Sequence, residues 1–171
     1  DPAAARENYR VGLTITERMA ERSPDNVFGR EDLAACYNNM AVASRRLNEP
    51  EVAQEYHRKG AEFLQQLVDA YPDQPGIKEN LAVHYRNIVT LCEEFNDLPT
   101  ARDYAARASA LRKELAEASP TSLPAQRRFV GALVDSGRVE YRMNEYDKAL
   151  EYADRAAEVL TRVFPDERIK Q

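Results

Sequence analysis

Few side chains in this sequence can act as nucleophiles, metal ligands or proton donors near neutral pH. The candidates are two histidines and two cysteines, namely His57, His84, Cys36 and Cys92. No acidic residue stands at the Glu-x-x-His spacing before either histidine, and no His-Glu-x-x-His motif, Cys-x-x-Cys motif or glycine-rich phosphate loop occurs. We therefore expect no enzymatic activity, no metal and no cofactor. The histidines should occupy ordinary packing or surface positions, and Cys92 should be buried as a small apolar side chain.

Composition and charge argue against several classes of function. The chain has 171 residues, a net charge of −5 and 43% hydrophobic residues, which fits a globular protein. An acidic chain is poorly suited to nucleic acid, and no apolar run approaches the roughly 18 residues of a membrane span. Sparse cysteines favour a reducing, cytoplasmic location. Because the chain starts at Asp1 without a methionine, we expect a fragment of a larger protein.

An internal repeat with a period of 48 residues organises the sequence. Ala53–Tyr56 recurs as Ala101–Tyr104 and again as Ala149–Tyr152. Asparagines recur at the same spacing, at Asn48, Asn96 and Asn144. We expect one domain made of a half repeat followed by three full repeats, over residues 1–26, 27–72, 73–120 and 121–165.

Each repeat carries the apolar spacing of two long helices. Asn48 and its equivalents should end the first helix, because asparagine tolerates the left-handed conformation, and Glu49 and Asp97 should cap the next one. Prolines end the second helix, since the preceding residue leaves the helical region, as at Tyr71 and Ser119. The predicted helices cover residues 3–22, 28–47, 50–70, 77–95, 98–118, 124–143 and 146–164.

The segment NEYDKALEYADRAAEVL, from Asn144 to Leu160, resembles the second-helix signature of the tetratricopeptide repeat, and its counterparts at 48–60 and 96–108 do so too. The signature's small residues would be Ala53, Gly60 and their equivalents, where two helices cross closely. The family period is about 34 residues, so a period of 48 lengthens each helix by about two turns. Long helices of this kind resemble the repeats of kinesin light chains and of regions attached to bacterial signalling kinases.

The resemblance implies an all-α fold, a right-handed α-solenoid of antiparallel helix pairs with about three and a half repeats and seven helices. The first helix of each pair would line a concave groove, where amide and basic side chains hold an extended peptide. Residues 48 apart would form ladders there, among them Asn39–Asn87–Asp135, Asn38–Arg86–Val134 and Val42–Thr90–Arg138. The predicted peptide-binding residues are Asn38, Asn39, Arg86, Asn87, Thr90, Asp135 and Arg138.

A fourth ladder alternates in charge, so we expect its members to pair with one another rather than with a ligand. It consists of Arg46, Glu94 and Arg142, beside Arg45 and Glu93. The family's clamp for a chaperone C-terminal carboxylate is not expected, because other residues stand at its Asn, Lys and Arg positions. Those replacements are Val42, Gly131 and Asp135.

The C-terminal helix keeps the apolar side chains of an internal repeat although no helix follows it. The residues concerned are Leu160, Val163 and Phe164. Either they pack against the helix at 124–143, or they form a self-association surface, since an uncapped repeat end is a ready interface.

We therefore predict a non-catalytic interaction scaffold that binds a peptide segment of a partner protein. Two alternatives stay open. One is a regulatory sensor that binds a small ligand or signal peptide and controls an attached enzyme. The other is a self-association module that forms a homo-oligomer through the ends of the repeat array.

Overall fold

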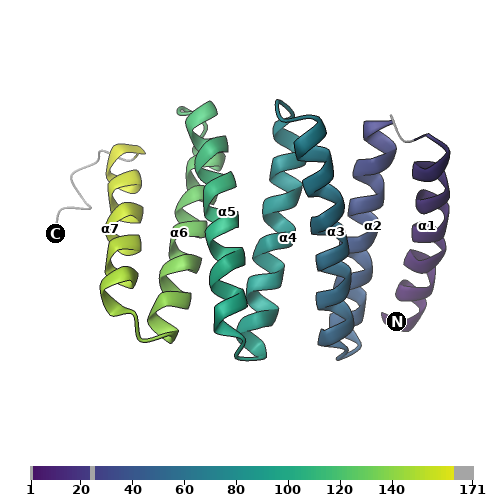
Figure 1. Cartoon of the computed structure of the whole chain (residues 1–171), viewed down its shortest axis with the longest axis horizontal. Coiled ribbons are helices and arrows are strands. Elements are labelled where there is room, and N and C mark those ends of the chain that lie inside the picture. The colour runs from purple at the N-terminus through teal and green to yellow at the C-terminus, as the bar shows by residue number, and fades with distance from the viewer. Residues whose placement is uncertain (1, 24–25, 164–171) are drawn as a thin grey trace. The chain divides into compact units, whose positions relative to one another are not determined.

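The computed structural model describes residues 2–23 and 26–163, apart from the side chains of Pro2 and Phe28. These residues form seven α-helices and no strand (Figure 1). The helices are α1 (Pro2–Arg22), α2 (Val27–Arg46), α3 (Pro50–Ala70), α4 (Pro75–Glu94), α5 (Leu98–Ala118), α6 (Leu123–Arg142) and α7 (Tyr146–Val163). Every predicted helix is confirmed, with its described ends within two residues of the prediction.

The chain divides into two compact units, Asp1–Leu91 and Cys92–Gln171, which we call the N-terminal and C-terminal units. The boundary falls inside α4. Within each unit, consecutive helices pack as antiparallel neighbours joined by short turns, α1 on α2 and α2 on α3 in the first, α5 on α6 and α6 on α7 in the second (Figure 1). The predicted all-α class of antiparallel helix pairs is thereby confirmed.

The turn inside each helix pair depends on an asparagine, as predicted. Asn48, Asn96 and Asn144 have φ angles of 61°, 57° and 62°, which lie in the left-handed region. A residue in this conformation at the helix end lets the chain reverse tightly into the next helix. The asparagine that recurs every 48 residues in the sequence therefore marks three equivalent turns.

One of the two predicted helix caps is confirmed and the other is wrong. The Asp97 side chain accepts a hydrogen bond from the Thr100 backbone N–H at 3.3 Å, which confirms it as the cap of α5. Glu49 makes no capping hydrogen bond to α3. Its carboxylate instead accepts two hydrogen bonds from Arg6 Nη1, at 2.8 and 2.6 Å, because a glutamate side chain is long enough to reach α1.

Small residues mark the places where paired helices cross, as the repeat signature implies. Ala41 of α2 and Ala53 of α3 are both fully buried and belong to one apolar cluster. At the equivalent crossing of α6 and α7, a Cβ atom on Gly137 would lie 3.3 Å from the carbonyl oxygen of Ala149. Larger side chains at these positions would force the helices apart.

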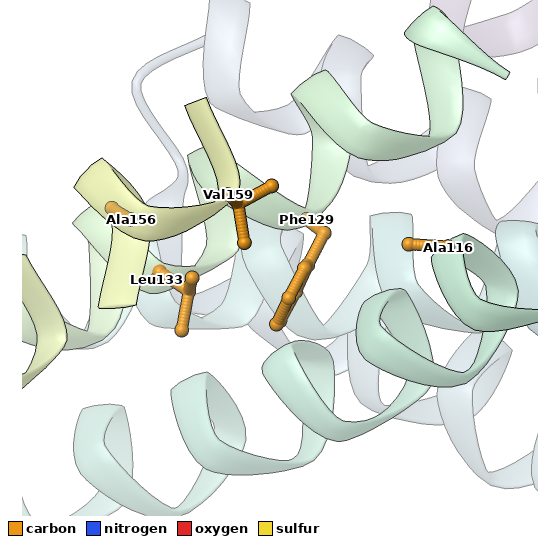
Figure 2. Close-up of a cluster of buried hydrophobic side chains, with 5 residues drawn as sticks. All are labelled: Ala116, Phe129, Leu133, Ala156 and Val159. Atoms are coloured by element: carbon orange, nitrogen blue, oxygen red, sulfur yellow. The ribbon is translucent and has the colours of Figure 1, made fainter. Parts of the chain in front are cut away.

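Each unit has its own apolar core. In the N-terminal unit Leu13, Leu33 and Met40 are buried together. In the C-terminal unit Phe129 and Val159 lie in a buried cluster shared by α5, α6 and α7, whose members are Ala116, Phe129, Leu133, Ala156 and Val159 (Figure 2). Cys92 is fully buried, as predicted. Phe95 follows the last residue of α4 and is 40% exposed.

Candidate interaction surfaces

A pair of amide side chains joins α2 to α4 in the N-terminal unit. Asn87 Nδ2 donates a hydrogen bond to Asn38 Oδ1 at 3.3 Å. Both side chains are half-buried, whereas Asn39 and Arg86 beside them are exposed. Thr90 is half-buried one turn further along α4, and its hydroxyl donates to the Arg86 carbonyl oxygen at 3.2 Å. We call these five residues the α2–α4 surface.

The amide pair corrects the register of the predicted ladder. Asn87 was expected to face Asn39, its equivalent 48 residues earlier, but its hydrogen-bond partner is Asn38. Successive repeats are related by a rotation as well as a translation, so exact equivalents do not face each other. The sequence therefore located the polar row but not which of its side chains meet.

The two predicted site residues of the C-terminal unit lie in a compact ion-pair cluster. Arg138 donates two hydrogen bonds to Glu93, at 3.0 and 2.8 Å, and a further Arg138 nitrogen lies 3.0 Å from Asp135. The hydrogen bond to Glu93 raises the pKa of the Arg138 guanidinium. Arg138 is thus held by two carboxylates of its own unit.

Arg142 also pairs with Glu93, which corrects the fourth ladder. Its Nη1 donates to the Glu93 backbone carbonyl at 3.0 Å and lies 3.6 Å from the Glu93 carboxylate. Its Nη2 donates to Asn96 Oδ1 at 3.3 Å. The sequence predicted that Glu94 would pair with Arg142. Neighbouring residues point in different directions around a helix, and on α4 it is Glu93 that faces α6.

The two histidines form a buried pair that connects α3 to α4. Their rings meet edge to face with centroids 5.4 Å apart, and His84 Nδ1 lies 3.1 Å from the His57 carbonyl oxygen. The His84 ring fills the space above Gly60, where a Cβ atom would collide with it. The expectation of packing positions is confirmed, since His57 is 5% and His84 2% exposed.

Burial keeps both imidazoles neutral. It lowers the pKa of His57 to about 3, with further contributions from His84 and from the positive charge of Arg45. Burial also lowers the pKa of His84, although hydrogen bonds to backbone groups of His57 and Ala34 oppose that shift. Neutral histidines offer one N–H donor and one acceptor nitrogen each.

A small cavity next to the α2–α4 surface was missed by sequence reasoning. It lies between α2, α3 and α4, has a volume of about 350 Å³, and is lined by Arg45, Arg46, His57 and Asn87 over the apolar Ala41 and Leu91. The sequence analysis had assigned both arginines to structural pairs and His57 to packing. The signal available in the sequence was the adjacent Arg45–Arg46 pair in the last turn of α2.

The predicted self-association residues lie at the end of α7. Val159 is buried in the cluster of Figure 2, Val163 packs on that cluster, and both Leu160 and Val163 are half-buried. Phe164 lies outside the described residues. Packing against α6 therefore covers part of this apolar set, and its use by another copy stays a prediction.

Two negative findings concern only the described part of the chain. In residues 2–23 and 26–163, no three or more His, Cys, Asp or Glu side chains are grouped so as to hold a metal ion. No helix in those ranges combines the length and apolar character required to cross a membrane.

Comparison with known families identifies one match. Residues 33–75, which include most of α2 and all of α3, match the model of the family Tetratricopeptide repeat. The resemblance seen in the sequence is thereby confirmed. No curated protein matches the chain.

Comparison with solved structures supports the fold. The crystal structure of BtubC (BKLC) from P. vanneervenii, a kinesin-light-chain-like repeat protein, aligns with a TM-score of 0.61 and 20% identity, over 90% of this chain and 57% of that one. The chain thus spans little more than half of that protein's length. A de novo designed helical repeat protein, DHR64, aligns with a TM-score of 0.46 and 19% identity, over 99% and 90% of the two chains. At this identity the likeness to BtubC shows the α-solenoid fold alone. The repeat match supports a protein-interaction scaffold in general terms.

Proposed function

We propose that this chain is a non-catalytic scaffold whose α2–α4 surface binds an extended peptide segment of a partner protein. The observation that carries the proposal is the hydrogen bond between Asn87 and Asn38. This bond leaves both N–H groups of Asn38, and one N–H and the oxygen of Asn87, for a peptide. An amide pairs with the backbone of a peptide of any sequence. The hydrogen bond also fixes the two side chains in advance, which lowers the entropic cost of binding.

The C-terminal unit does not contribute to the proposed surface. Asp135 and Arg138, although predicted as peptide-binding residues, are engaged with each other and with Glu93. A peptide would have to break charge-assisted hydrogen bonds to reach them, and such bonds are about twice as strong as neutral ones. The neutral amides of α2 and α4 demand no such exchange.

Peptide display against the full chain tests the proposal. Peptides that bind the wild type should bind the variant Asn38→Ala with Asn87→Ala at least about tenfold more weakly, because two amide contacts to the peptide backbone are lost. The control is Gln66→Ala, which removes an exposed amide from α3 of the same unit. Equal binding by wild type and double variant, at unchanged melting temperature, would move the site elsewhere.

A further inference from the structure

The cavity between α2, α3 and α4 is positively charged. Of the residues that line it, Arg45 and Arg46 are cationic and none is a carboxylate. Asn87 supplies a neutral amide and His57 a neutral imidazole. The positive charge of Arg45 lies close enough to His57 to contribute to the lowered pKa of its imidazole. This lining suits an anion, and its volume of about 350 Å³ suits a small one.

One polar atom of His57, a residue that lines the cavity, has no partner among the described residues. His57 is 5% exposed, and its Nδ1 atom makes no hydrogen bond within the part of the chain that the structure describes. Leaving a buried nitrogen unpaired costs about 1–3 kcal/mol, so such atoms are rare in folded proteins. The neighbouring His84 has its Nδ1 within hydrogen-bond distance of a carbonyl oxygen. In this ring orientation the Nδ1 atom is fully enclosed. A bound group with acceptor oxygens would become its partner once the His57 ring turns the nitrogen toward the cavity.

We propose that this cavity binds a dianionic phosphate group, held by Arg45 and Arg46 and by N–H donors of Asn87 and His57. A phosphate group carries about 1.5 to 2 negative charges at pH 7 and three acceptor oxygens, which matches two cations and neutral donors better than a monoanionic carboxylate does. Guanidinium groups bind phosphate oxygens in a bidentate geometry. This site overlaps the proposed peptide-binding surface at Asn87 but does not include Asn38.

Titration of the full chain with inorganic phosphate tests the proposal directly. At pH 7.5 and constant ionic strength, NMR should show saturable shifts of the His57 ring and Arg46 side-chain signals. Arg46→Gln should weaken binding by about tenfold or more, because a charge-assisted pair is lost. The matched control is Arg127→Gln, which makes the same charge change at an exposed position of α6. It should bind phosphate like the wild type.

Three results would overturn the phosphate site. They are shifts that grow linearly without saturation, an equally strong response to sodium acetate, and undiminished binding by Arg46→Gln. Arg46 is exposed, so its replacement leaves the core intact and the variant should remain folded. A melting curve of each variant verifies this before binding is measured.

A second arm separates the two sources of phosphate. A short acetylated and amidated peptide with a central phosphoserine is compared with inorganic phosphate. Tighter binding of the peptide assigns the site to a phosphorylated protein segment, and equal binding assigns it to a free phosphate compound. Arg46→Gln distinguishes the inference from the proposed function, because it should weaken inorganic phosphate binding while leaving the capture of unphosphorylated peptides unchanged.

Discussion

The two units build equivalent helix interfaces from different side chains. In the N-terminal unit, α3 and α4 meet through two buried imidazoles, and His84 fits over the bare backbone of Gly60. Forty-eight residues further on, the equivalent positions of α5 and α6 carry small side chains. The residues that replace His57, His84 and Gly60 there are Ala105, Ala132 and Ala108.

The difference shows how one helix crossing can be filled in two ways. A large ring opposite a glycine and two small residues opposite each other occupy a similar space. The polar atoms near these two crossings differ in whether they have a hydrogen-bond partner. In the C-terminal unit Ser136 Oγ hydrogen-bonds to the Ala105 carbonyl oxygen at 3.4 Å, and Arg102 pairs with the buried Glu140. In the N-terminal unit His57 Nδ1 has no such partner in the described residues, and His57 is one of the residues that line a cavity.

Acid should give the largest effect, because only the N-terminal interface contains histidines. The pKa of His57 is lowered to about 3 in the folded chain, against about 6.5 unfolded. The unfolded state therefore binds more protons below pH 6.5, and stability falls as the pH decreases from 6.5 toward 3. Each such histidine costs about 1.4 kcal/mol per pH unit, so His57 alone removes about 2–3 kcal/mol between pH 7 and 4.5.

Denaturant unfolding at a series of pH values measures this slope, with His57→Ala as the control. The alanine recreates the arrangement at Ala105, and a residue that does not titrate should flatten the slope by one proton's contribution. Carboxylates titrate equally in both proteins, so they cancel in the difference. Parallel slopes would mean that His57 is protonated in the folded protein.

Replacing Gly60 by alanine should be the next most damaging change. The added Cβ would collide with the His84 ring, within 2.6 Å of its Nδ1 atom. We expect a loss of about 2 kcal/mol in the free energy of unfolding, since overpacking costs about 1–3 kcal/mol. Adding His84→Ala should recover most of it by reproducing the Ala108–Ala132 arrangement. A double-mutant cycle without coupling would show that the two positions do not meet.

Local signals in the sequence were enough to predict the helices and turns. Asn48 and its equivalents fix the turns through a backbone preference that a single residue carries. Contacts between helices were harder to predict. The pairing of Asn87 with Asn38, and of Arg142 with Glu93, depends on the rotation between repeats, which a count of 48 residues does not contain. The cavity depends on three helices at once, so no spacing within one helix revealed it.

A third prediction concerns the ion pair between α5 and α6 in the C-terminal unit. Glu140 is 5% exposed, and Arg102 donates to both of its oxygens, at 2.8 and 2.6 Å. Arg102→Ala should lower the free energy of unfolding by about 1–2 kcal/mol, because a buried carboxylate loses its charge partner. The double variant Arg102→Leu with Glu140→Leu should be more stable than the single one. If Arg102→Ala is as stable as wild type, water replaces the arginine.

The smallest effect should come from Glu93, and it tests the register of the repeats. Glu93→Gln removes the carboxylate shared by Arg138 and Arg142. Arg138 keeps Asp135, and Arg142 keeps Asn96 and the Glu93 backbone carbonyl. We therefore expect a loss of only about 0.5–1 kcal/mol, and less at high salt, because both arginines keep other partners and lie partly in solvent.

A double-mutant cycle decides which glutamate meets α6. The free energies of unfolding of Glu93→Gln, Arg142→Gln and their combination should reveal a coupling of about 0.5 kcal/mol. The same cycle with Glu94→Gln is the matched control, and it should give a coupling near zero, since the partner of Arg142 is Glu93. Coupling to Glu94 in place of Glu93 would restore exact 48-residue ladders. Residues exactly 48 apart would then face each other, and Asn87 would be expected to meet Asn39 instead of Asn38. The two units would then differ only in which side chains fill their helix interfaces.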